Sequence, residues 1–151
     1  MSETASARRL RLPAEPGSVA QFQSLAKEAG MACGFSPEAL FRLELALEEV
    51  LVNIVNYAYL QKAEGWIALS YRVGEPDELI FEVRDGGRPF DPLSLDEPET
   101  GAQISDREVG GLGVFLVRKM ADHVSYRRSD DQNILTLTFR GSAKAADGLR
   151  D

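Results

Sequence analysis

Three short segments, far apart along the chain, constrain this sequence more than any other feature. Residues 49–53 read Glu-Val-Leu-Val-Asn, residues 85–92 read Asp-Gly-Gly-Arg-Pro-Phe-Asp-Pro, and residues 110–113 read Gly-Gly-Leu-Gly. In that order they supply a carboxylate and an amide on one helix face, a carboxylate that leads a tight turn, and a glycine-rich entry to a helix. Each segment alone is common in proteins without ligands. Their order and type together indicate a nucleotide site.

The first segment belongs to a helix that we predict over residues 37–59, with Ser36 as its N-terminal cap. Successive residues turn by about 100°, so Glu49 and Asn53 lie next to each other, opposite an apolar stripe. Apolar residues flank this side too, so we interpret it as a pocket wall; the alternative is a pair of ordinary exposed residues. Glu48 points away from Asn53, and we treat it as structural. The stripe comprises Leu40, Leu43, Leu47, Val50, Leu51, Ile54 and Ala58.

The second segment follows a predicted hairpin. Residues 66–73 and 78–84 read as its strands, because apolar side chains recur at every second position in the latter. Asp85 is therefore expected at a strand end, followed by two glycines that permit ligand approach where a side chain would block it. A carboxylate beside exposed backbone can accept a hydrogen bond from an exocyclic amine. The alternative is a hairpin-like connection with a surface aspartate.

The third segment precedes a helix predicted over residues 112–122. Its free N–H groups and the positive end of the helix dipole suit phosphate groups. The sequence contains no Gly-x-x-x-x-Gly-Lys-Ser/Thr, and a Rossmann fingerprint would need a glycine in place of Leu116. The polar stretch 92–109 before the glycines shows no periodicity. Stretches of this length in compact domains are lids, binding loops or disordered segments.

The remaining pattern predicts an α+β fold. A strand begins at residues 8–12, a helix spans residues 16–29 and ends at Gly30, and a second hairpin joins residues 124–128 to 134–140 across a loop of five residues. We expect a two-layer sandwich, with a mixed, mainly antiparallel sheet and helices on one face. One domain would span residues 8–140, between a flexible N-terminus (1–7) and a flexible tail (141–151).

Composition excludes several classes of function. The net charge of −7 and the scattered basic residues argue against a nucleic-acid surface and favour a protein partner. The sequence has no run of 18 apolar residues that would span a membrane and no apolar N-terminal leader, so we expect a cytoplasmic protein. With one cysteine and one histidine, a Cys/His zinc cluster is excluded, and a metal would need oxygen ligands.

In this order the three segments resemble the N, G1 and G2 boxes of the superfamily of gyrase, heat-shock chaperone, histidine-kinase and mismatch-repair ATPases (GHKL, the Bergerat ATP-binding fold). Glu-x-x-x-Asn followed by Tyr57-Ala58-Tyr59, then Asp-Gly-Gly-x-Pro-Phe-Asp-Pro, then Gly-Gly-Leu-Gly-x-Phe-Leu-Val, looks most like the bacterial anti-sigma-factor serine kinases. The similarity extends over about residues 8–140.

The resemblance implies roles for residues on the phosphate side of the site. Glu49 would be catalytic and activate the nucleophile, and Asn53 would coordinate Mg²⁺. Gly111 and Gly113 would frame the phosphates of ATP beneath a lid formed by residues 93–109.

On the adenine side, the resemblance implies that Asp85 contacts the amino group and that Gly87 lets the base approach. A threonine near the end of the sheet often assists this site in the family, and Thr136 is our candidate, with Thr138 as an alternative. Tyr57 stands where many members carry histidine, which leaves the wall beside the nucleotide open to variation.

The function implied by the resemblance is a serine kinase that transfers the γ-phosphoryl group of ATP to a small antagonist protein of the STAS type. It would also sequester a sigma factor or an equivalent target, without contact to nucleic acid or membrane, and a homodimer is an open alternative for its oligomeric state. Two other functions remain: a module that binds ATP and sequesters a partner without phosphorylating it, and a histidine-kinase catalytic module. No histidine precedes Glu49, which disfavours the latter.

Overall fold

The computed structural model describes residues 8–59, 64–75, 77–89 and 116–141. Its elements are β1 (Arg8–Pro13), α2 (Pro16–Ala32), α3 (Pro37–Asn53), a π-helical segment (Ile54–Ala58), β2 (Trp66–Val73), β3 (Glu78–Asp85), β4 (His123–Ser129) and β5 (Gln132–Arg140). Residues 116–120 are also helical. The predicted terminal segment 1–7, the lid 93–109 and all but the first residue of the predicted tail lie outside the described residues.

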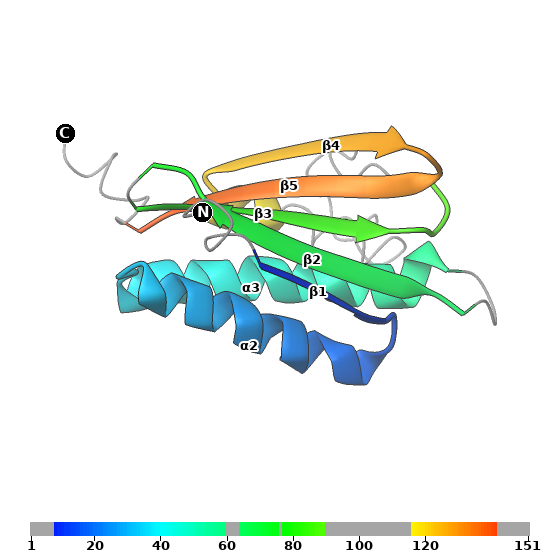
Figure 1. Ribbon diagram of the computed structural model, residues 1–151, viewed down its shortest axis with the longest axis horizontal. Coiled ribbons are helices and arrows are strands. Elements are labelled where there is room, and N and C mark those ends of the chain that lie inside the picture. Colours follow the sequence, from blue (N-terminus) through cyan, green and yellow to red (C-terminus); the bar gives the residue numbers. More distant parts are fainter. Residues whose placement is uncertain (1–7, 60–63, 76, 90–115, 142–151) are drawn as a thin grey trace, which may run out of the picture.

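The five strands form one sheet in the order β1-β2-β3-β5-β4. Every pairing among these described strands is antiparallel. Helices α2 and α3 lie beside each other against one face of the sheet (Figure 1). The predicted α+β class and two-layer sandwich are therefore confirmed.

The hydrophobic core lies between the sheet and the two helices. Side chains alternate between the two faces of a strand, so Leu79, Phe81 and Val83 of β3 all point toward the helices, where they are buried. They belong to one cluster with Phe22 of α2 and Leu47 of α3. Burial of each large apolar side chain stabilises the fold by about 1.5–3 kcal/mol. The core thereby determines which face of each strand carries the polar residues.

Helix α2 ends later than the sequence predicted. The prediction placed its end at Gly30, but the helix continues to Ala32, and the glycine with positive φ is Gly34, at 79°. Gly30 is buried, and a Cβ at this position would lie 2.7 Å from Cδ2 of Leu40 on α3. This glycine therefore lies where α2 packs against α3 and does not end the helix.

Helix α3 begins as predicted and ends in a way that was not predicted. The hydroxyl of Ser36 accepts a hydrogen bond from the backbone N of Ala39 at 3.1 Å, which confirms the cap. After Asn53 the helix widens into the π-helical segment Ile54–Ala58. Such segments are rare in proteins, and those that occur are frequently found at functional sites. Here the change of geometry directly follows one of the predicted site residues.

The β4–β5 hairpin has a tighter turn than the predicted loop over residues 129–133. Its two turn residues are Asp130 and Asp131, which have φ values of 52° and 62°. Two consecutive residues with positive φ are typical of the two-residue turns that match the twist of a hairpin, and aspartate tolerates this conformation. Because the turn is short, Asn133 belongs to β5 and pairs with Asp85 of β3.

Candidate functional site

The candidate site is centred on Asp85, the last residue of β3, which is only 4% exposed. Its Oδ1 accepts hydrogen bonds from the backbone N of Gly87 at 2.8 Å and from Nδ2 of Asn133 at 2.9 Å. Among the described residues, no hydrogen bond reaches the second oxygen, Oδ2. The protein thus holds one carboxylate oxygen, and the other remains an acceptor for a ligand.

Burial raises the pKa of Asp85 above the ordinary value for aspartate. The hydrogen bonds from Asn133 and Gly87, together with the positive charge of Arg128, oppose this rise without cancelling it. A carboxyl group with a raised pKa loses its proton less readily than an exposed one, because removal from water disfavours the charged form. The fold therefore places the carboxyl group of Asp85 in an environment that disfavours its charged form.

Asn133 is the functional residue that the sequence interpretation missed. Besides its bond to Asp85, its Nδ2 donates to the backbone O of Arg88 at 2.8 Å. Its Oδ1 accepts from the hydroxyl of Tyr126 at 2.6 Å and from Nη1 of Arg128 at 3.2 Å. The amide thus orients the carboxylate and ties the turn after β3 to β4 and β5. If Asp130 and Asp131 had been taken as a two-residue hairpin turn, Asn133 would have been assigned to the strand, within reach of Asp85.

The turn that follows Asp85 is attached to the end of the long helix. The backbone N of Arg88 donates to the O of Ala58, and its Nε donates to the O of Tyr57, both at 2.9 Å. The backbone N of Gly86 donates to the hydroxyl of Tyr59 at 2.7 Å. These bonds attach the turn of the second sequence segment to residues 57–59, which follow shortly after the first segment along the chain.

Gly87 has a packing role that does not depend on a ligand. It is buried, and a Cβ at this position would lie 2.7 Å from both the carbonyl carbon and the Cβ of Ala58. Real Cβ atoms do not approach other atoms so closely, and the carbonyl belongs to a backbone that Arg88 of the turn already holds through two hydrogen bonds. The glycine is thus needed for the turn to lie against the π-helical segment. The predicted approach of a base to Gly87 stays a prediction.

Glu49 and Asn53 lie one helical turn apart near the C-terminal end of α3. Asn53 is 8% exposed, Glu49 is partly buried, and Glu48 is exposed. Burial raises the pKa of Glu49, and the negative charge of Glu48 raises it further. Asn53 lies directly before the π-helical segment that ends at Ala58, and Ala58 contacts the Asp85 turn. Asn53 and Asp85 are therefore placed at the same end of the molecule.

The helix that follows the third segment is held against α3 by a buried arginine. Nη1 of Arg42 donates to the backbone O of Met120 at 3.3 Å and lies 3.7 Å from Oδ2 of Asp122. Val117 of the same helix is buried in the core. The predicted phosphate-binding residues Gly111 and Gly113 lie outside the described residues, so their role stays a prediction.

Thr136 does not lie beside Asp85, contrary to the sequence interpretation. Asn133 and Leu135 alternate along β5 on the face that carries Asp85, whereas Thr136 and Thr138 point to the opposite face of the sheet. The threonines were selected by residue type, and the strand register moves them away from the site. Asn133, rather than Thr136 or Thr138, is the residue of β5 that contacts Asp85.

The described residues contain no group of three or more His, Cys, Asp or Glu side chains that could hold a metal ion. Asn53 provides one amide oxygen at the end of α3. Mg²⁺ commonly takes only one or two protein ligands and completes its coordination with water and phosphate oxygens. A single amide is therefore a protein contribution that fits this ion when a polyphosphate is also bound.

Known proteins share this sequence pattern over most of the chain. A family profile described as a histidine kinase-like ATPase domain matches residues 12–139. The serine-protein kinase RsbW of Listeria innocua is 32% identical over 119 residues, which cover 76% of this chain and 75% of the relative. The serine/threonine-protein kinase BtrW of Bordetella bronchiseptica is 33% identical over 111 residues, which cover 74% and 78% of the two chains.

Solved structures share the fold. The RsbU and RsbW domains of a Mycobacterium tuberculosis protein match with a TM-score of 0.63 at 14% identity, covering 89% of this chain and 32% of that one. The histidine kinase domain of a blue-light activated kinase from Erythrobacter litoralis matches with a TM-score of 0.52 at 25% identity, covering 69% and 45%. This chain thus spans less than half of either solved chain. In the part of the chain that the structure describes, no helix is long and apolar enough to cross a membrane.

Proposed function

Because this chain belongs to the histidine kinase-like ATPase family, and within it to the group of anti-sigma-factor serine kinases, we propose that it is an ATP-dependent protein serine kinase. Its substrate would be a serine of a small antagonist protein, and it would also sequester a sigma factor or a similar regulatory protein. The observation that carries this proposal is the carboxylate of Asp85, which is buried and oriented through one oxygen, while its other oxygen accepts no hydrogen bond from the described residues.

Asp85 would recognise the adenine base. The exocyclic amine of adenine is a hydrogen-bond donor, and Oδ2 of Asp85 is an acceptor that no described residue engages. Guanine carries a carbonyl oxygen where adenine carries this amine, so a buried acceptor would discriminate against it. A polar group that loses its partner in a buried site costs about 1–3 kcal/mol, or more when it is charged. The orientation by Asn133 and Gly87 would therefore set nucleotide selectivity as well as affinity.

Glu49 would act as the general base for the serine hydroxyl of the partner. A base works best when its pKa lies near the working pH, and both burial and the charge of Glu48 move the pKa of Glu49 upward, toward that range. The proton of the hydroxyl would pass to the carboxylate of Glu49 while the serine oxygen bonds to the γ-phosphorus and ADP leaves. Most of the rate enhancement would come from positioning and charge neutralisation.

Asn53 would hold Mg²⁺ through its amide oxygen, one helical turn from Glu49. When bound, the ion would supply positive charge that offsets the negative charge of the phosphates. Asn53 and Glu49 share one helix, so the metal ligand and the base would be kept at a constant separation. The π-helical segment directly after Asn53 would set the direction in which the chain leaves the site toward the Asp85 turn.

We test this function with purified chain, Mg-ATP and candidate antagonist proteins from the same organism, followed by intact mass spectrometry. A gain of one phosphate on a partner serine is the expected result, and the same reaction with the Glu49→Gln variant is the control. A partner that binds tightly without any gain of mass would replace the kinase by a module that only sequesters. ATP is an intracellular nucleotide, so the proposed reaction belongs in the cytoplasm.

A further inference from the structure

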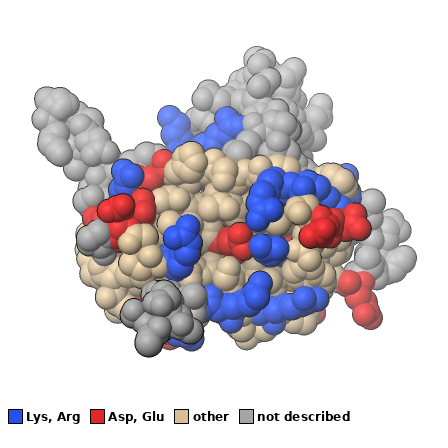
Figure 2. All heavy atoms as spheres, turned by 45° about the horizontal axis from the view of Figure 1, so that its top comes forward, with Lys and Arg blue, Asp and Glu red and all other residues tan. Residues whose placement is uncertain are grey.

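The outer face of the sheet, which is turned away from α2 and α3, is rich in positive charge although the chain as a whole carries −7. The strand register determines this face, because residues that alternate with the buried ones share it. Figure 2 shows basic side chains spread over the visible side of the molecule, with acidic groups between them. The acidic and basic residues of this face are Arg9, Arg11, Arg72, Arg84, Arg127, Arg140, Glu78 and Glu82.

The two glutamates of this face are already engaged by arginines. Nε of Arg84 lies 2.9 Å from Oε1 of Glu82, and Nε of Arg140 lies 3.6 Å from Oε2 of Glu78. The other four arginines are exposed, and none of them forms an ion pair with a described residue. They belong to three strands, β1, β2 and β4, so their charge extends across the sheet. These four are Arg9, Arg11, Arg72 and Arg127.

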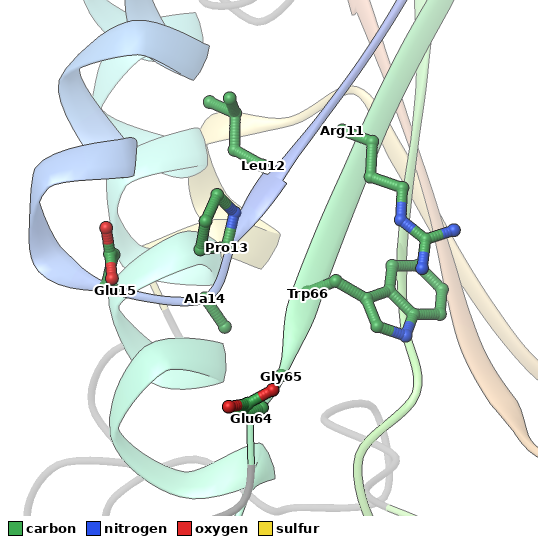
Figure 3. Close-up of a pocket in the computed structure, with 8 residues that line it drawn as sticks. All are labelled: Arg11, Leu12, Pro13, Ala14, Glu15, Glu64, Gly65 and Trp66. Carbon is green, nitrogen blue, oxygen red and sulfur yellow. The ribbon is translucent and has the colours of Figure 1, made fainter.

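The chemistry of the face resembles that of protein interfaces. All of its permanent cations are arginine, and the planar guanidinium group pairs with carboxylates through two parallel hydrogen bonds and is more weakly hydrated than lysine. The guanidinium of Arg11 lies 4.1 Å from the ring centroid of Trp66, and both side chains line a hollow of about 790 Å³ that Glu15 and Glu64 also line (Figure 3). Arginine and tryptophan are enriched among the residues that dominate binding energy.

The charge of the rest of the molecule disfavours two other ligands for this face, a second copy of the chain and a nucleic acid. Helices α2 and α3 carry the opposite charge, with five glutamates against Lys27 and the buried Arg42. A second copy placed symmetrically on the sheet would set arginines against arginines, and a long nucleic acid would meet the net negative charge of the chain. A partner with a local acidic patch avoids both penalties. The glutamates are Glu28, Glu38, Glu44, Glu48 and Glu49.

We propose that the outer face of the sheet docks an acidic surface of a protein partner. Arg9, Arg11, Arg72 and Arg127 would pair with its carboxylates, and the stacked Arg11 and Trp66 would provide an ordered anchor. The proposal rests on the proposed function only in taking the partner to be a protein. It places docking on the opposite side of the sheet from Asp85, so that a partner bound there would leave the nucleotide site accessible.

The test uses a synthetic peptide of about twenty glutamates as the probe. Amide chemical shifts of the labelled chain are followed by NMR during titration, and we expect the changes to centre on β1, β2 and β4. Arg72→Glu should weaken the association by about fivefold or more, because it replaces an attraction by a repulsion of similar size. The matched control is Lys27→Glu on α2, which changes the net charge equally and should alter the affinity less than twofold. Arg9→Glu is a second variant should Arg72→Glu lower the folding yield.

Three results would overturn the proposal. The first is a loss of peptide affinity in Lys27→Glu equal to that in Arg72→Glu. The second is tighter binding of a twenty-base-pair DNA duplex than of the peptide at the same salt concentration. The third is a dimer of the native chain, seen by sedimentation, that Arg72→Glu dissociates. Mg-ATP affinity is measured on the same samples and should not change in Arg72→Glu. A chain that binds the peptide as expected but phosphorylates no partner would contradict the kinase alone. A chain that phosphorylates a partner but ignores the peptide would contradict only the docking face.

Discussion

At the scale of single residues, the burial of Asp85 makes the stability of the fold depend on pH. Its pKa in the folded chain is raised, so the folded state holds the proton more tightly than the unfolded state does. The contribution of this carboxyl group to stability is therefore complete below the ordinary pKa of about 3.9 and is lost as the pH rises through the raised value. As the pH rises, the carboxyl group loses its proton in an environment that disfavours the charged form.

Asp85→Asn should therefore preserve or increase the free energy of unfolding at neutral pH, because the amide oxygen can still accept from Gly87 and Asn133. The gain over the native chain should appear as the pH rises above about 4 and should level off at higher pH. ATP binding should weaken by about 1.5–3 kcal/mol, the range for a hydrogen bond to a charged group. Urea unfolding at several pH values and calorimetry with ATP measure both. Native ATP affinity in the folded variant would remove Asp85 from the site.

Glu49→Gln should keep the fold and ATP binding but slow phosphoryl transfer by about 10²–10⁴, because the amide cannot take the serine proton. Single-turnover transfer to the partner is measured at saturating Mg-ATP. The control is Glu48→Gln, which should retain transfer at neutral pH. Because the charge of Glu48 helps to raise the pKa of Glu49, this control should move the acidic limb of the pH–rate profile to lower pH. Transfer at the native rate by Glu49→Gln would exclude the general-base role.

At the scale of elements, the site depends on two contacts of the Asp85 turn: with the π-helical segment, through Gly87, and with β5, through Asn133. Gly87→Ala should destabilise the fold by about 1–3 kcal/mol, because the new Cβ meets backbone that cannot move aside. Gly17→Ala in α2 is a matched control, since no atom lies within 4 Å of its Cβ position, and it should be neutral or stabilising. Urea unfolding compares them, and equal stabilities would refute the packing role of Gly87.

Asn133 and Thr136 lie on opposite faces of β5, so substitutions at these two positions should affect ATP binding differently. Asn133→Ala should lower the free energy of unfolding by about 1–3 kcal/mol and weaken ATP binding, since it leaves the buried carboxylate of Asp85 with one donor fewer. Thr136→Ala, three residues along the same strand, should leave ATP affinity unchanged. Calorimetry measures the ATP affinity of both variants and tests this difference. A loss of affinity only in Thr136→Ala would restore the original assignment of the threonine.

At the scale of the whole molecule, nucleotide should join the three segments into one cooperative unit. Mg-ATP at one hundred times its dissociation constant should raise the free energy of unfolding by about 2.7 kcal/mol, since only the folded chain binds it. The sequence-based expectation of a lid adds that amide exchange over residues 93–109 should slow at the same time. Mass-detected hydrogen exchange tests this. Identical exchange there with and without Mg-ATP would refute the lid while leaving the stability prediction standing.

The amino-acid sequence by itself determined the class of fold, the bounds of most elements and the position of Asp85 at a strand end. These features follow from local rules: apolar side chains repeat with the period of a helix or a strand, and Ser36 satisfies backbone donors three residues away. The order and residue types of the three segments likewise indicated the family. Each of these signals lies within a few residues of the chain.

Only the tertiary structure decided the roles of Gly30, Gly87, Asn133 and Thr136. Gly30 looked like a helix terminator, but it lies inside α2 and faces Leu40 on the next helix. Asn133 lies 48 residues from Asp85 along the chain, and its contact exists because strand register and a two-residue turn bring them opposite each other. A shift of one residue in that register reverses the face of every side chain. Residue type alone therefore could not tell the asparagine that holds the carboxylate from the threonine on the far side of the sheet.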